Sequence, residues 1–162
     1  GQGHNRFTPI QIANYIATIA NGGTLYSTTL LNCVKSNDYT KVVYDNQPVV
    51  KNESVDNNQG FVSILQEGMR AVATTGTAKS FAHFMVPVAA KTGTVQSDNA
   101  SVNSGVFVCY APADDPEIAI AVVVENGNSG SSILSVAEKM MEYYFDDSED
   151  AEVSYFENSL IM

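Results

Sequence analysis

Apolar residues recur at helical spacing in three segments of the chain. The first segment begins at the natural N-cap Thr8 and ends at Gly22-Gly23, the second follows the cap candidates Asp56-Asn57-Asn58, and the third follows Ser131 or Ser132. Each segment has one apolar stripe, which predicts a helix with one face packed on a core. The residues expected on these faces are Ile12, Ile16, Ile19 and Ala20 in the first helix, Phe61, Ile64, Leu65, Gly68, Met69 and Val72 in the second, and Ile133, Val136, Ala137, Met140, Met141 and Tyr144 in the third.

Three apolar runs of strand length lie between the second and third helices. They cover residues 85–90, 105–111 and 118–125, and the connection between the last two is short enough to force antiparallel pairing. Residues 24–50 are rich in β-branched and aromatic side chains broken by polar turns, which predicts short strands or a hairpin on the surface. This order of elements predicts an α+β fold, an antiparallel sheet with helices laid on it.

Charge is unevenly spread along the chain. Of its 162 residues, 44% are hydrophobic and 16% are charged, which is typical of a globular domain. The formal net charge of −10 argues against a nucleic-acid partner, because phosphate binding requires clusters of Lys and Arg. We expect one domain over residues 1–145 and a solvated acidic tail over residues 146–162. The tail has neither Lys nor Arg, and its acidic residues are Asp146, Asp147, Glu149, Asp150, Glu152 and Glu157.

Residues that commonly bind metal ions are few. The cysteines are Cys33 and Cys109, the histidines are His4 and His83, and their spacing forms no zinc site. Cys109 stands inside an apolar run and is expected to be a buried core thiol. We therefore expect neither a metal ion nor another cofactor.

The tetrapeptide Lys91-Thr92-Gly93-Thr94 carries the clearest chemistry. It places a cation, two hydroxyls and a glycine at the end of a predicted strand, a combination suited to binding a carboxylate beside a peptide laid along a sheet edge. A phosphate-binding loop is excluded, because Ala90 stands where that loop has glycine and a strand pattern surrounds the lysine. Lys-Thr-Gly is also one of three motifs of penicillin-binding proteins and β-lactamases. The triplet alone slightly favours a plain surface lysine on a strand, because three residues are easily matched by chance.

Further segments occur in an order that resembles one family. The chain is similar, across nearly its whole length, to the C-terminal part of the transpeptidase domain of class B penicillin-binding proteins, within the penicillin-recognising serine transferase/hydrolase superfamily. The segments that carry the resemblance are Gly1-Gln2-Gly3, Thr8-Pro9-Ile10-Gln11-Ile12-Ala13, Ile19-Ala20-Asn21-Gly22-Gly23, Gly76-Thr77-Ala78, Ala90-Lys91-Thr92-Gly93-Thr94, Phe107-Val108-Cys109-Tyr110-Ala111-Pro112 and Ile120-Ala121-Val122-Val123-Val124-Glu125-Asn126-Gly127.

This resemblance implies an incomplete portion of the β-lactamase/transpeptidase-like fold, and a part in the serine acyl transfer that cross-links peptidoglycan stem peptides and is blocked by β-lactams. It implies that Lys91 supplies positive charge near the substrate carboxylate and that the hydroxyls of Thr92 and Thr94 hydrogen-bond it. Gly93 would let the backbone approach closely, and the backbone N–H of Thr94 would be an oxyanion-hole donor. The full-length protein is then expected at the extracytoplasmic face of the bacterial cell membrane, held by an N-terminal anchor outside this sequence.

The nucleophile motif of such enzymes is absent from this sequence. No lysine has a serine three residues before it, as Ser-x-x-Lys requires, and Ser101-Val102-Asn103 follows the Lys-Thr-Gly strand whereas the family has Ser-x-Asn before it. We therefore expect this piece to be inactive alone and to associate through an exposed sheet edge or helix face. Three alternatives stay open: a β-lactamase, a β-lactam sensor domain, and a non-catalytic scaffold module with the same fold.

Overall fold

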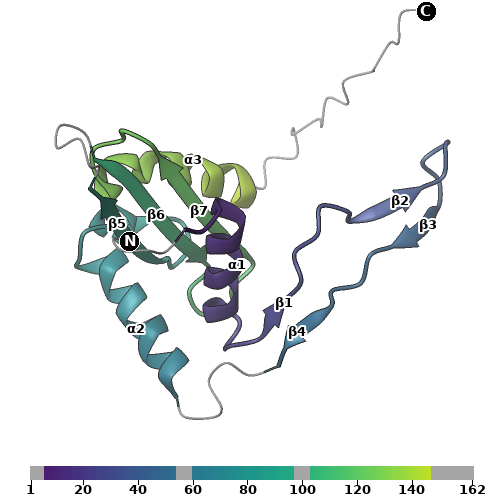
Figure 1. Ribbon diagram of the computed structural model, residues 1–162, viewed down its shortest axis with the longest axis horizontal. Helices are drawn as coiled ribbons and strands as arrows, with labels where there is room; N and C mark the ends of the chain where they lie inside the picture. The colour runs from purple at the N-terminus through teal and green to yellow at the C-terminus, as the bar shows by residue number, and fades with distance from the viewer. Residues whose placement is uncertain (1–5, 54–59, 97–102, 147–162) are drawn as a thin grey trace, which may run out of the picture.

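The computed structural model describes residues 6–53, 60–96 and 103–146, and Figure 1 labels its elements. The helices are α1 (Pro9–Ala20), α2 (Phe61–Thr74) and α3 (Leu134–Phe145), with two short 3-10 helices, η1 (Lys79–His83) and η2 (Gly130–Ile133). The strands are β1 (Leu25–Tyr26), β2 (Cys33–Lys35), β3 (Val42–Asp45), β4 (Val50–Asn52), β5 (Ala89–Val95), β6 (Ser104–Ala111) and β7 (Ile118–Val124).

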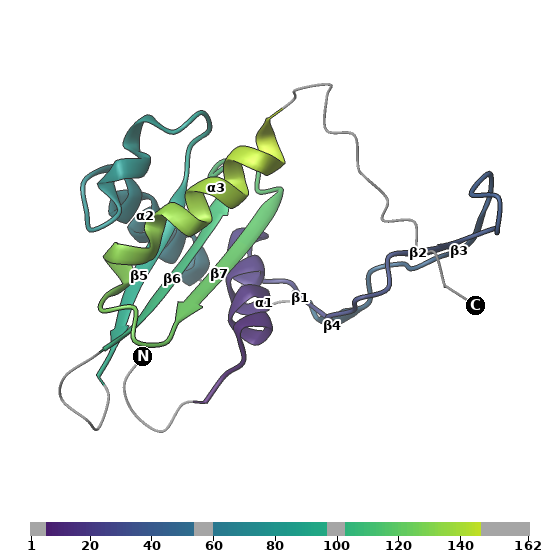
Figure 2. The same cartoon turned by 90° about the horizontal axis from the view of Figure 1, so that it is seen from above.

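A three-stranded antiparallel sheet in the order β5-β6-β7 forms the centre of the molecule. β5 pairs with β6 without a break in register from Ala89↔Tyr110 to Val95↔Ser104, and β7 pairs with the other side of β6. α1 and α3 lie on opposite faces of this sheet, while α2 packs against β5 and α1 (Figures 1 and 2). The predicted α+β fold is confirmed.

Side-chain alternation gives the sheet two packed faces. One face carries Phe107, which packs in a cluster with Met141 of α3. The other carries Val108, which packs in a second cluster with Ile16 of α1 and Met69 of α2. Because helices cover both faces, the strands read as continuous apolar runs and not as an alternation of apolar and polar residues.

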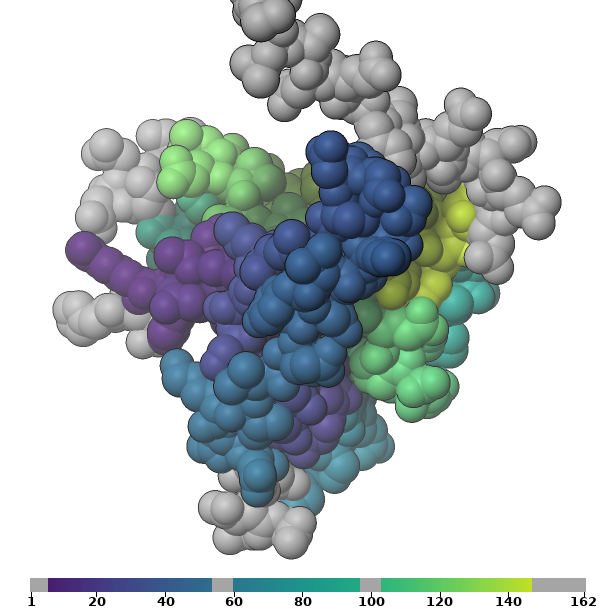
Figure 3. Space-filling model, turned by 90° about the vertical axis from the view of Figure 1, so that its right-hand side faces the viewer, coloured from purple at the N-terminus to yellow at the C-terminus, as the bar shows by residue number. Residues whose placement is uncertain are grey.

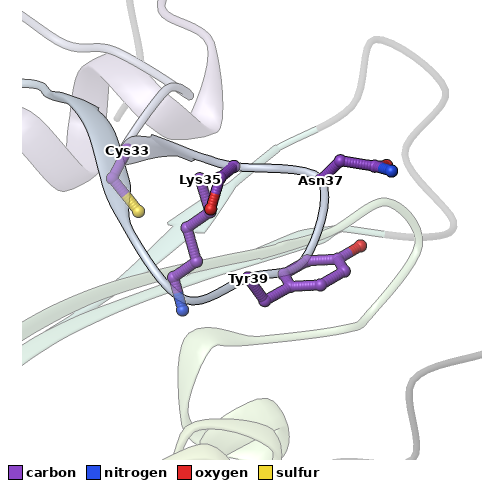
Figure 4. A pocket seen from close by; sticks show the side chains of 5 residues that line it. Cys33, Lys35, Asn37 and Tyr39 are labelled. Carbon is purple, nitrogen blue, oxygen red and sulfur yellow. The ribbon is translucent and has the colours of Figure 1, made fainter.

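Between α1 and α2 the chain forms a long two-stranded ribbon that stands away from the body in Figures 1 and 2; in Figure 3 the ribbon points toward the viewer. β1 pairs with β4 at its base, and β2 pairs with β3 toward its tip. The expected surface hairpin is confirmed, and many of its apolar side chains, such as Leu30 and Val43, are exposed. A hollow at the tip is formed by one hairpin alone (Figure 4), and it is lined by Cys33, Lys35, Ser36, Asn37 and Tyr39.

α1 begins and buries its apolar face as the sequence predicts. The N–H of Thr8 donates a hydrogen bond to Oε1 of Gln11 at 2.9 Å, and the helix ends before Gly22, whose φ is 84°. Ile16 and Ile19 are 3% and 6% exposed. Glycine adopts a left-handed φ readily because it has no Cβ, so Gly22 ends the helix where the chain turns toward the ribbon.

The apolar stripe expected to bury α2 is wrong in most of its residues. Phe61, Ile64 and Leu65 are 59%, 64% and 47% exposed, and the buried residues are Val62, Met69 and Ala73. The helix is apolar on two sides, and the side that is buried packs on α1, β5 and η1. The cap candidates 56–58 lie outside the described residues.

β5 begins later than the apolar run 85–90 suggests. Met85 is 58% exposed and the strand starts at Ala89, so the Lys-Thr-Gly motif lies within the strand and not at its end. Pro87 has no N–H to give to a strand ladder, and its carbonyl instead accepts a hydrogen bond from the N–H of Ala113 at 2.7 Å.

The start and the face of α3 also differ from the prediction. Ser129, not Ser131 or Ser132, is the N-cap, and it caps the 3-10 helix η2 that leads into α3. The N–H of Ser129 donates to Oγ of Ser132 at 3.1 Å. Of the residues expected on the buried face, Ile133, Ala137 and Met141 are buried, whereas Val136, Met140 and Tyr144 are 46%, 47% and 49% exposed. The sheet in the described residues covers only one side of this helix.

Gly130 fixes the distance between η2 and the sheet. A Cβ added at Gly130 would stand 2.4 Å from the carbonyl oxygen of Val106, and 2.5 Å and 2.7 Å from the carbonyl oxygen and amide nitrogen of Gly93. The backbone of η2 therefore rests directly on the backbone of β5 and β6 at the motif strand.

Replacing Gly130 by alanine is expected to destabilise the chain by about 1–3 kcal/mol, because the added methyl forces the backbones apart. Urea unfolding measures the change. Gly68→Ala in α2 is the matched control: its Cβ meets nothing within 4 Å, and removing a helix glycine stabilises by about 0.5–1 kcal/mol. A Gly130→Ala chain as stable as the wild type would contradict the close contact.

The two cysteines are expected to differ in reactivity. Cys109 is fully buried, and this burial raises the pKa of its thiol to about 12, whereas Cys33 lies partly exposed on the ribbon. Because the thiolate is the reactive form, a thiol reagent at pH 8 should label Cys33 and leave Cys109 unlabelled until the chain is unfolded. Mass spectrometry of the labelled peptides distinguishes the sites, and rapid labelling of Cys109 in the folded chain would refute the burial.

Candidate functional site

The four residues of the Lys-Thr-Gly-Thr motif lie side by side in β5, an edge strand of the described sheet. Lys91 and Thr94 are exposed, and Thr92 and Gly93 are partly buried. Strand geometry puts Lys91 and Gly93 on the face of α1 and puts Thr92 and Thr94 on the opposite face. The motif is thus extended and accessible, and its polar groups are distributed over the two faces and the edge of the sheet.

The Lys91 side chain folds back along its own strand. Its Nζ donates a hydrogen bond to the carbonyl oxygen of Thr92 at 2.6 Å. Backbone N–H and C=O directions repeat at every second residue of a strand, so the N–H of Thr94 lies on the same side of β5 as that carbonyl. The ammonium of Lys91 and the amide of Thr94 therefore share one side of the strand. Among the described residues Lys91 forms no ion pair, so its charge is available to a ligand.

A cavity of about 440 Å³ lies beside the motif, between β5, β6 and the helices α1 and α2. Its walls are mostly apolar, and Lys91 contributes the cation. Among the residues that line it are Ile16 and Ile19 of α1, Leu65 and Met69 of α2, and Lys91 and Gly93 of β5.

Thr77 contacts the motif through its hydroxyl, and the sequence had indicated no role for this residue. Its Oγ1 lies 2.7 Å from Oγ1 of Thr92, within hydrogen-bonding distance. The segment Gly76-Thr77-Ala78 was part of the resemblance, but nothing in its spacing from Lys91 indicated a contact. The available signal was a hydroxyl in the turn between a helix and the motif strand.

An exposed ion pair attaches α2 to the turn between β6 and β7. Nη2 of Arg70 donates to Oδ2 of Asp114 at 3.1 Å, and Nη1 donates to Oδ1. The hydrogen bonds from Arg70 lower the pKa of the Asp114 carboxyl, and the same bonds raise the pKa of Arg70. This charge pair links α2 to the β6–β7 turn at the surface and leaves the Lys91 charge separate.

Other candidate groups contribute little to the described site. Of Ser101-Val102-Asn103 only Asn103 is described, and its carbonyl accepts the N–H of Asn128 at 2.9 Å. A second triplet of this pattern, Ser97-Asp98-Asn99, also follows the motif in the sequence and lies outside the described residues. Over residues 6–53, 60–96 and 103–146, no group of three or more His, Cys, Asp or Glu is placed to hold a metal ion. Within the same ranges, no helix has the length and apolar character needed to cross a bilayer.

Comparison with known proteins identifies the family. A family model of the penicillin binding protein transpeptidase domain matches residues 1–142. Penicillin-binding protein 2A of Bacillus subtilis is 37% identical over 162 residues, covering 88% of this chain and 22% of its own length. Peptidoglycan D,D-transpeptidase MrdA of Acinetobacter baumannii is 30% identical over 158 residues, covering 89% of this chain and 23% of its own.

A solved structure gives the same result for the fold. The penicillin G acyl-enzyme complex of penicillin-binding protein A from M. tuberculosis matches with a TM-score of 0.69 and 26% identity, covering 89% of this chain and 33% of that chain. The chain spans less than a quarter of the length of the curated relatives named above. The match over most of this chain, on an antiparallel sheet with a Lys-Thr-Gly edge strand, shows that it belongs to the transpeptidase-domain family of class B penicillin-binding proteins, as a partial portion of that domain.

Proposed function

We propose that this chain is the carboxylate-binding and oxyanion side of a peptidoglycan D,D-transpeptidase whose nucleophilic serine lies in an upstream segment of the full-length protein. In this reaction the serine attacks a stem peptide ending in D-Ala-D-Ala, the last D-Ala leaves, and an amine takes the acyl group from the serine. The observation that carries the proposal is the exposed motif strand, with its cation on an edge strand beside an open cavity.

Lys91, Thr92 and Thr94 are assigned to the carboxylate of the stem peptide or β-lactam. The ammonium supplies a positive charge that no described carboxylate neutralises. The two hydroxyls lie on one face of the strand and supply neutral donors. Hydrogen bonds to a charged acceptor are about twice as strong as neutral ones, so this donor set favours a ligand that ends in a carboxylate.

The backbone N–H of Thr94 is assigned to the oxyanion that forms when the serine attacks. Its position on the same side of β5 as the Thr92 carbonyl and the Lys91 ammonium supports this role. Gly93 leaves room for the acyl group, since it has no side chain. Removal of one oxyanion donor typically costs about 10²–10³ in rate.

We place the upstream segment against the apolar residues of α2 that are exposed among the described residues. Ile64 and Leu65 of α2 are exposed, and Leu65 also lines the cavity beside Lys91. Packing against these residues would bring a serine close to the motif strand and would cover an apolar surface that a folded domain rarely leaves exposed. We also propose that residues 1–145 belong to the transpeptidase domain and that residues 146–162 form a separate acidic tail. The full-length protein is proposed to lie at the extracytoplasmic face of the membrane.

Replacing Lys91 by alanine in the full-length protein is expected to lower the rate of acylation by a fluorescent penicillin about 10- to 100-fold, because a hydrogen bond between charged partners is lost. Gel fluorescence over time measures this rate. Lys35→Ala, which removes a lysine of the ribbon, should label at the wild-type rate. The isolated 162-residue chain should stay unlabelled, because it has no Ser-x-x-Lys.

Unchanged labelling of a folded Lys91→Ala protein would reject the role of Lys91. Labelling of the isolated chain would reject the split active site. Rapid loss of the label from the wild-type protein would indicate a β-lactamase in place of a transpeptidase.

The isolated chain is expected to associate at high concentration, because an edge strand and the apolar side of α2 are uncovered. Light scattering should give an average mass above that of one chain. Ile64→Lys should reduce the association, whereas Ser135→Lys, at an exposed position of α3, should not. A mass of one chain at every concentration tested would contradict the expectation.

A further inference from the structure

Thr77 reaches the motif strand from the turn that ends α2. Its hydroxyl lies 2.7 Å from the hydroxyl of Thr92, and the two residues are 15 positions apart in the sequence. Thr77 is exposed and Thr92 is partly buried, so this pair lies at the surface where a ligand of β5 would bind.

The turn that carries Thr77 is held on both sides. The N–H of Gly76 donates to the carbonyl of Ala71 at 3.0 Å, and the N–H of Ala78 donates to that of Val72 at 3.1 Å. A Cβ on Gly76 would stand 2.7 Å from Cα of Val72, and Ala78 is fully buried. Thr77 therefore lies between two anchored neighbours, and its backbone has little freedom to move away from β5.

A hydroxyl donates one hydrogen bond and accepts up to two, which makes the direction of this contact important. If Thr92 donated its proton to Thr77, it would have none left for a ligand carboxylate. If Thr77 donates, the proton of Thr92 stays free, and a chain of two hydrogen bonds in one direction strengthens each member. A carboxylate can only accept, so a bound ligand favours the second arrangement.

We infer that Thr77 is a positioning residue: its hydroxyl donates to Oγ1 of Thr92 and so directs the Thr92 proton toward the carboxylate of the stem peptide or β-lactam. The inference rests on the proposed function, since it assigns a role within the same site. It makes Thr77 act through Thr92 and not by contact with the reacting atoms.

The test compares two ligands on variants of the full-length protein: a penicillin with a free carboxylate, and its methyl ester. Thr77→Val replaces the hydroxyl by a methyl group of similar size, and Thr77→Ala is a second variant in case valine disturbs folding. Thr77→Ser restores the hydroxyl. Thr75→Val is the matched control, because the Thr75 hydroxyl bonds to the carbonyl of Ala71 within its own helix turn at 3.2 Å.

Thr77→Val is expected to lower the second-order rate constant for acylation by the free penicillin about three- to tenfold, because one hydrogen bond is lost. The rate constant for the methyl ester should change less than twofold. Thr77→Ser and Thr75→Val should stay near the wild type. In a Thr92→Val background, Thr77→Val should have no further effect, because its target hydroxyl is gone.

Equal losses with both ligands, an undiminished effect in the Thr92→Val background, or no loss in either folded Thr77 variant would each overturn the inference. These outcomes differ from failure of the proposed function itself. In that case the wild-type protein would not be acylated, or Lys91→Ala would be acylated at the wild-type rate.

Discussion

The unbroken antiparallel pairing of β5 with β6 is the constraint on which the site depends. Seven consecutive pairs, from Ala89↔Tyr110 to Val95↔Ser104, fix which face and which side of the strand each motif group occupies. A slip of one residue would exchange the faces of Lys91 and Thr92. The buried residues of β6 oppose such a slip, because Phe107 and Tyr110 would each move to the wrong face. The backbone of Gly130 also lies directly against that of Gly93, which fixes the distance between η2 and β5.

The same sheet supports the proposal that this chain supplies one side of an active site. The strand carries an ammonium, two hydroxyls and a backbone amide on its faces and along its accessible edge, and all of these groups can bind or stabilise negative charge. None is a nucleophile poised by a base, and acyl transfer needs one. In the proposed arrangement, a complementary segment completes the site by packing at the cavity beside Lys91 and on the exposed side of α2. The chemistry and the uncovered apolar surface thus support the same proposal.

The sequence predicted those elements whose local signals agreed with their packing. The end of α1 at Gly22, the three central strands and the burial of Cys109 followed from turn residues and apolar runs. The buried side of α2 could not be predicted, because the helix is apolar on two sides and periodicity does not say which one meets a partner. The start of β5 was misplaced because Pro87 interrupts a run that remains apolar. The Thr77–Thr92 contact depends on a turn joining a helix to a strand, and no periodic pattern reports it.

A crystal structure of the full-length protein acylated by a penicillin would decide whether β5 binds the ligand carboxylate, because it locates that carboxylate relative to the strand. We expect a carboxylate oxygen within hydrogen-bonding distance of the hydroxyl of Thr92 or Thr94, with the acyl oxygen facing the N–H of Thr94. A carboxylate held elsewhere, with β5 covered by protein, would contradict it.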